Sequence, residues 1–206
     1  MVQLPTKTFT LEEFLKLPET KPASEYIDGQ IIQKPMPQGK HSKLQGKLVT
    51  AINEVVQSQK IALAFPELRC TFSGRSMVPD VAVFAWERIP TDERGDVGNV
   101  FQAAPDWTIE ILSPDQSQTK VTSNILHCLE HGRRLGWLID PDERAVLVYP
   151  PGQQPQILHK EQEILPVPNS MDNFQLSVGQ PRSRRIRYPI VKKRTSKPRQ
   201  DTPESA

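Results

Sequence analysis

Two acidic residues lie inside apolar segments of a composition typical of buried β-strands. Asp80 follows Pro79 within residues 77–84, and Glu110 lies within residues 107–112, thirty positions later. Both segments are short, rich in β-branched residues and bounded by Gly, Ser or Pro. Burial of a carboxylate is unfavourable by several kcal/mol unless the group is paired or binds a metal. The two acids therefore predict a shared partner, and a divalent cation is the simplest one.

The type of ion follows from the ligand atoms. Side chains alternate between the faces of a strand, so Asp80 shares a face with Phe84, and Glu110 shares a face with Leu112. If the strands are neighbours, the two carboxylates point the same way. Hard oxygen ligands without Cys or His favour Mg²⁺, with Mn²⁺ as a substitute, over zinc. Such an ion polarises a phosphate and lowers the pKa of a bound water.

Simpler roles for the same residues are also open. Asp80 could cap a turn or pair with Arg75 or Arg88. Glu25 precedes a hairpin signal, where an acid at the surface is ordinary. His41 could cap the start of a helix rather than take part in catalysis. These alternatives require no metal and no substrate.

A zinc site and a membrane segment are both disfavoured. His127 and His131 are four apart on a predicted helix, but no Glu stands where a zinc protease needs it. Cys70 and Cys128 lie in apolar contexts, which predicts buried thiols in a reducing, cytoplasmic setting. No apolar run approaches the roughly 18 residues of a membrane span. No basic segment followed by an apolar one marks a secretion signal, so no membrane partner is expected.

The N-terminal third predicts a helix, a hairpin and a second helix. Residues 10–13 form a capping box, which opens a short helix through Leu17. Residues 25–27 and 30–33 flank Asp28-Gly29, which is the signal of a two-residue hairpin turn. Residues 41–57 carry an apolar stripe at the 3.6-residue period of an amphipathic helix.

The remaining elements predict an α/β fold with a central mixed β-sheet flanked by helices. A helix is expected from Ser117 to Glu130. The polar connection at residues 87–105 is of the kind that borders a functional cleft. Further strands are expected at residues 61–65, 67–72, 135–139 and 145–149, with edge strands within 157–167.

The charge distribution separates a domain, residues 1–180, from a basic tail, residues 181–206. The tail has nine basic and two acidic residues, so its formal net charge is +7. Because the whole chain has a formal net charge of +2, the domain carries −5. The tail shows no periodicity and is expected to be disordered. It could serve solubility, or it could add non-specific, salt-sensitive affinity for DNA.

The order of these motifs resembles a known family. Glu25, His41, Pro79-Asp80, the Glu-Ile-Leu-Ser-Pro of residues 110–114 and the Gly-Trp-Leu-Ile-Asp-Pro of residues 136–141 are similar to the "putative restriction endonuclease" family. That family, long treated as a domain of unknown function, belongs to the PD-(D/E)XK nuclease superfamily. The resemblance implies a restriction-endonuclease-like fold and metal-dependent cleavage of DNA.

The same resemblance assigns roles to single residues. It implies that Asp80 and Glu110 are metal ligands. We further expect Glu25 and the carbonyl of Ile111 to help these two acids hold one or two Mg²⁺ ions. Glu25 contributes an acid from the N-terminal segment, and the resemblance favours a catalytic role for His41. The expected reaction is hydrolysis of phosphodiester bonds by a Mg-bound water. Nucleases of this superfamily are often dimers, so a homodimer is a further expectation.

The chain departs from the superfamily pattern at its lysine. The pattern places Lys at position 112, where this chain has Leu112, and the family's usual basic position on the next helix is Asn124. Lys120 lies four residues earlier, on the same predicted helix face, and is expected to stabilise charge. The alternative is a catalytically weak or inactive DNA-binding or assembly module on the same fold.

Overall fold

The computed structural model describes residues 9–114, 116–131, 134–171 and 174–179, which form two β-sheets and the helices around them. The predicted mixed α/β architecture is confirmed. The predicted disorder of the basic tail, residues 181–206, lies outside the described residues. Within those residues, no helix is both long and apolar enough to cross a membrane.

The larger sheet has six strands in the order β10-β9-β8-β7-β6-β3. β7 and β8 pair in parallel and the other neighbours pair antiparallel, which confirms the mixed sheet expected from the sequence. Its strands are β3 (Ala62–Pro66), β6 (Val81–Ala85), β7 (Trp107–Ile111), β8 (Leu135–Asp140), β9 (Ala145–Tyr149) and β10 (Gln156–Leu158).

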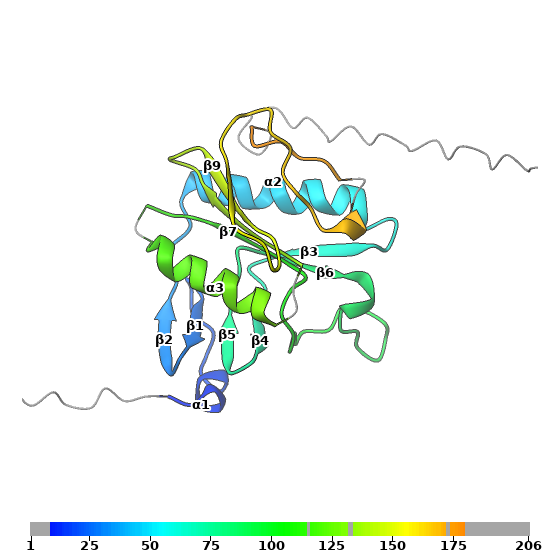
Figure 1. The fold of residues 1–206 in the computed structure, drawn as a ribbon. Helices are drawn as coiled ribbons and strands as arrows, with labels where there is room; N and C mark the ends of the chain where they lie inside the picture. The colour runs from blue at the N-terminus through cyan, green and yellow to red at the C-terminus, as the bar shows by residue number, and fades with distance from the viewer. Residues whose placement is uncertain (1–8, 115, 132–133, 172–173, 180–206) are drawn as a thin grey trace, which may run out of the picture.

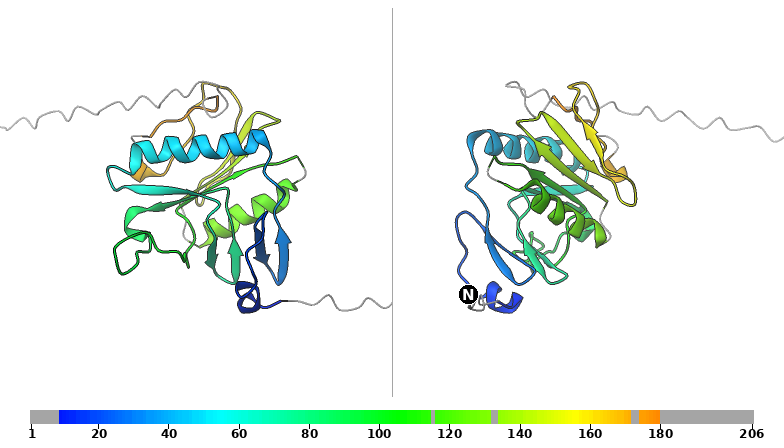
Figure 2. Two further views of the ribbon diagram at one scale, coloured as in Figure 1. Left: turned by 180° about the vertical axis from the view of Figure 1, so that it is seen from behind. Right: turned by 60° about the vertical axis from the view of Figure 1, so that its left-hand side comes forward.

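The two long helices, α2 (Gly39–Val56) and α3 (Gln118–Glu130), lie on opposite sides of this sheet (Figures 1 and 2). The stripe of α2 joins Trp107, Ile109 and Ile111 of β7 in the main core. On the other face, a Cβ at Gly136 of β8 would lie 2.2 Å from Cγ2 of Ile125. Glycine there lets α3 approach the sheet closely.

A second sheet of four strands, in the order β2-β1-β5-β4, lies on the α3 side (Figure 1). Its strands are β1 (Ser24–Ile27), β2 (Gln30–Gln33), β4 (Cys70–Phe72) and β5 (Arg75–Met77). The predicted hairpin turn is confirmed, with Asp28 at φ 51° and Gly29 at φ 83°. The sequence patterns did not predict that the hairpin and β4–β5 form a sheet of their own.

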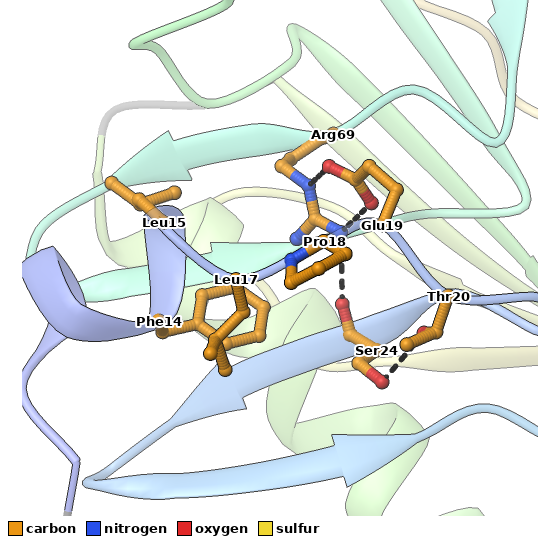
Figure 3. A pocket seen from close by; sticks show the side chains of 8 residues that line it. All are labelled: Phe14, Leu15, Leu17, Pro18, Glu19, Thr20, Ser24 and Arg69. Carbon is orange, nitrogen blue, oxygen red and sulfur yellow. Dashed lines mark hydrogen bonds and ion pairs between the residues drawn. The ribbon is translucent and has the colours of Figure 1, made fainter.

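The short helix α1 (Leu11–Leu15) is attached to this second sheet (Figure 3). It begins with the predicted capping box. The guanidinium of Arg69 donates to both carboxylate oxygens of Glu19, at 2.9 and 2.7 Å, and to the carbonyl of Ser24 at 3.0 Å. The same guanidinium lies 5.2 Å from the centre of the Phe14 ring. Arg69 therefore links the segment after α1 to the sheet. Two short 3-10 helices, η1 (Trp86–Arg88) and η2 (Asn169–Met171), complete the fold.

Candidate functional site

Asp80 and Glu110 come together because their strands are neighbours, as predicted. β6 and β7 pair antiparallel with Val81 opposite Ile109, so the residues one step outward, Asp80 and Glu110, are also opposite. The prediction that Asp80 lies inside a continuous strand is wrong. Pro79 has no N–H to donate to a sheet, and Asp80 occupies a bend just before β6.

Lys34, directly after β2, places its ammonium between the two acids. Its Nζ lies 2.8 Å from Oδ1 of Asp80 and 3.7 Å from Oε2 of Glu110. The ammonium also donates to the carbonyl of Val78 at 2.7 Å. The Lys34 side chain is 13% exposed, against 2% for Asp80 and 5% for Glu110. A single buried ammonium thus contacts both predicted metal ligands.

Asp80 is further held by residues of α2 and β7. Its Oδ2 accepts the backbone N–H of Ile111 at 2.8 Å. Nε2 of His41 lies 3.3 Å from Oδ1 without the alignment of a hydrogen bond, while Nδ1 of His41 is 3.2 Å from Oγ of Ser113. Gln45, one turn along α2, donates to the Asp80 carbonyl at 2.8 Å. The helix therefore positions both the histidine and the backbone of the bend.

Glu25 is buried beside this group rather than lying at the surface. Its Oε1 accepts the backbone N–H of Val78 at 2.8 Å. The first strand of the hairpin therefore supplies a third carboxylate, and it also satisfies a buried N–H in the segment that leads to Asp80.

The electrostatics of the cluster reflect burial first and charge second. Burial raises the pKa of Glu110 well above its usual range; Lys34 opposes this, and the carboxylates of Asp80 and Glu25 add to it. Burial also raises the pKa of Glu25. Burial acts on Asp80 in the same direction, but Lys34 and His41 outweigh it and lower the pKa of Asp80 to about 2. Burial would lower the pKa of Lys34, yet the three acids raise it above its usual value. Of these three carboxylates, Asp80 alone has a lowered pKa.

A cleft of about 570 Å³ opens beside the cluster, between the β1–β2 hairpin and α3. Lys34 and Glu25 line it from the hairpin, and Lys120 and Asn124 line it from α3. Lys120 is exposed, and among the described residues its ammonium forms no bond to the acids, so its role in charge stabilisation stays a prediction. Leu112 follows β7 and packs against the apolar cluster under α3.

The histidine pair of α3 packs against an aromatic ring. The ring centres of His127 and Phe72 are 5.0 Å apart and stacked, and His127 lies 4.6 Å from His131. Nδ1 of His131 lies 2.7 Å from the carbonyl of His127. In the part of the chain that the structure describes, no three His, Cys, Asp or Glu side chains are arranged to hold a metal ion.

Comparison with known proteins identifies the family. The family model described as "Putative restriction endonuclease" (Uma2) matches residues 11–179. The chain belongs to this family. A crystal structure described as that of a putative nuclease belonging to DUF820, from Anabaena variabilis ATCC 29413, is 62% identical. The match covers 82% of this chain and 95% of that one, with a TM-score of 0.81. Among curated proteins, no relative matches the chain. The family resemblance and the nuclease-like fold predicted from the sequence are therefore confirmed.

The sequence patterns missed one member of the cluster, Lys34. Its local context, Gln33-Lys34-Pro35, is that of a polar residue leaving a hairpin strand, which is ordinary for an exposed lysine. The available cue was its place just after the strand paired with that of Glu25. Only the packing of the hairpin beside β6 and β7 brings its ammonium to the acids.

Proposed function

We propose that the chain is a metal-dependent DNA endonuclease whose site is formed by Asp80, Glu110 and Glu25. The observation that carries this proposal is the burial of three carboxylates at one place beside a cleft, with one lysine among them. Ionised buried carboxylates in excess of buried cations are unfavourable, and a bound metal cation would stabilise them. Membership of a restriction endonuclease family and a nuclease-like relative support a phosphodiester substrate.

The residues fit a magnesium ion. Mg²⁺ binds through one or two carboxylates and retains several waters, so it does not require three side-chain ligands. Asp80 and Glu110 offer hard oxygen atoms, and the ammonium of Lys34 stands in for a cation between them. We expect these two carboxylates, with the carbonyl of Ile111, to hold Mg²⁺ or Mn²⁺. Such an ion supplies polarisation of the phosphate and activation of a water.

The chain's own residues would orient the acids and receive the substrate. The backbone N–H of Ile111 holds Oδ2 of Asp80, and His41 lies against the other oxygen. Glu25 fixes the backbone of the approach to Asp80 through Val78. The neighbouring cleft would take the phosphate backbone, with Lys120 at its wall as the predicted stabiliser of charge.

A second function is favoured by the two positions that depart from the superfamily pattern. Leu112 packs in an apolar cluster and Asn124 is buried, so neither supplies a positive charge. The chain could then bind DNA without cutting it. This alternative predicts DNA binding without metal-dependent turnover, and weaker binding when residues 181–206 are removed. A DNA substrate, a homodimer and a cytoplasmic setting remain predictions.

Nicking of a supercoiled plasmid with Mg²⁺ and then Mn²⁺ tests the proposal. Wild type is expected to cut, and Asp80→Asn to lose about 100-fold or more, because an amide binds these ions poorly. Asp96→Asn is the matched control, since Asp96 is an exposed acid of the loop between η1 and β7. Equal cutting by wild type and Asp80→Asn would overturn the mechanism. DNA retained on a gel without any cutting would favour the binding module.

A further inference from the structure

Lys34 holds the position that a divalent cation would take in this site. Its ammonium contacts Oδ1 of Asp80, Oε2 of Glu110 and the carbonyl of Val78, all oxygen atoms. Carboxylate and carbonyl oxygens are also the ligands that a hard divalent cation prefers. Its side chain is 13% exposed, so water offers it little compensation for leaving these partners.

We infer that Lys34 is the lysine of this nuclease site: divalent metal displaces its ammonium from between Asp80 and Glu110 into the cleft, where it meets the substrate phosphate. This inference rests on the proposed function. In it, Lys34 takes the place of Lys120 as the principal positive charge of the site. Lys34 follows β2, and no sequence motif identifies it as a site residue.

Displacement follows from the distances. Metal ions of this type bind carboxylate oxygens at about 2.0–2.1 Å. An ion that shared Oδ1 of Asp80 with Oε2 of Glu110 would leave no room for an ammonium 2.8 and 3.7 Å from the same atoms. The two cations would also repel each other at such separations. The carboxylates can therefore serve the metal or the ammonium in its present position, but not both.

The cleft is the direction in which Lys34 can move. Lys34 lines it together with Glu25 and, from α3, Lys120 and Asn124. The flexible four-carbon stem of a lysine lets its ammonium move while the backbone stays in place. The Lys34 N–H is held by the carbonyl of Ala23 at 2.9 Å, which anchors that backbone.

The other candidates for this charge are less well placed. Position 112 is a leucine packed under α3, and position 124 is an asparagine. Lys120 is exposed at the wall of the cleft, whereas Lys34 already contacts both acids. A lysine that is delivered from the hairpin would explain how the chain dispenses with a basic residue at positions 112 and 124.

The test compares wild type with Lys34→Met in two measurements. The first is Mn²⁺ affinity by titration calorimetry without DNA, where Lys34→Met is expected to bind on the order of tenfold more tightly because no ammonium competes. The second is plasmid nicking, where the same variant is expected to lose on the order of 100-fold. Lys16→Met is the matched control, because Lys16 is an exposed lysine of the α1 region that pairs with Glu12.

The outcomes separate this inference from the proposed function. Unchanged or weaker Mn²⁺ binding by Lys34→Met would overturn displacement. Full cleavage by Lys34→Met, together with loss of cleavage in Lys120→Met, would show that Lys120 and not Lys34 stabilises the charge. Tighter Mn²⁺ binding by Lys34→Met, together with a wild type that never cuts DNA, would support displacement and overturn the proposed nuclease activity.

A second variant guards against misfolding of Lys34→Met. Lys34→Arg keeps the positive charge but replaces a compact ammonium with a planar guanidinium. It is expected to fold, to bind Mn²⁺ within about threefold of wild type and to cut DNA more slowly. If Lys34→Arg bound Mn²⁺ as tightly as Lys34→Met, competition by charge would be excluded.

Discussion

Two groups of oppositely charged side chains connect the N-terminal segment to the rest of the molecule, and they differ in burial. Around Arg69, one guanidinium serves Glu19, whose side chain is 72% exposed. Around Lys34, one ammonium lies among Asp80, Glu110 and Glu25, all of them buried. The first group pairs one cation with one acid, and the acid is exposed to solvent. The second group has three acids for one cation and is largely shielded from solvent.

The difference separates a structural contact from a candidate site. An exposed ion pair contributes about 0–1 kcal/mol and needs nothing further. A buried cluster with surplus carboxylates is unfavourable by itself, so it is maintained at a cost to stability. Perturbed pKa values of Asp80 and Glu110 beside a cleft are typical of functional sites.

The largest effect is expected when Lys34 is removed from the metal-free protein. Lys34→Met leaves buried carboxylates without their ammonium, which should lower the free energy of unfolding by about 3–5 kcal/mol. Urea unfolding in EDTA measures this. Combining it with Glu110→Gln should recover part of the loss, because the two residues interact across 3.7 Å. Strictly additive losses would mean that Lys34 and Glu110 do not stabilise each other.

A smaller effect is expected at Glu25, where charge and hydrogen bonding can be separated. Glu25→Gln keeps an oxygen that can accept the N–H of Val78, so stability should change by less than about 1 kcal/mol. Glu25→Ala leaves that buried N–H without a partner and should cost about 1–3 kcal/mol. Thermal unfolding of both variants gives the comparison. Equal losses would show that the carboxylate charge, and not its hydrogen bond, is what the fold needs.

The smallest effect is expected at the exposed pair. Glu19→Gln should lower stability by under about 1 kcal/mol. Its hydrogen bond with Arg69, more than the charge, lowers the pKa of Glu19 from 4.5. A lowered pKa means that the contribution is present above pH 4.5 and is lost as pH falls through the folded-state pKa. The stability difference between wild type and variant should therefore be present at pH 7 and disappear as the pH falls well below 4.5. A difference that persisted at low pH would assign the effect to packing.

Local patterns in the sequence were sufficient for most of the secondary structure and for part of the site. The capping box of residues 10–13, the Asp28-Gly29 turn and the stripe of α2 depend on neighbours within a few residues, and all appear as predicted. Asp80 and Glu110 were found because a carboxylate in an apolar segment is conspicuous by itself. The bend at Asp80 was missed because an apolar run does not reveal where Pro79 interrupts pairing.

The amino-acid sequence by itself determined the elements, the two acids and the family, since each rests on residue types at short or ordered spacing. Tertiary structure alone decided that Lys34 would be buried among carboxylates 46 and 76 positions away in the chain. It also decided that the hairpin would form a second sheet with β4 and β5. A single lysine gives no periodic signal in the sequence, and its role depends on where the fold places its backbone. Pairing between β1 and β5, distant in sequence, carries it to the acids.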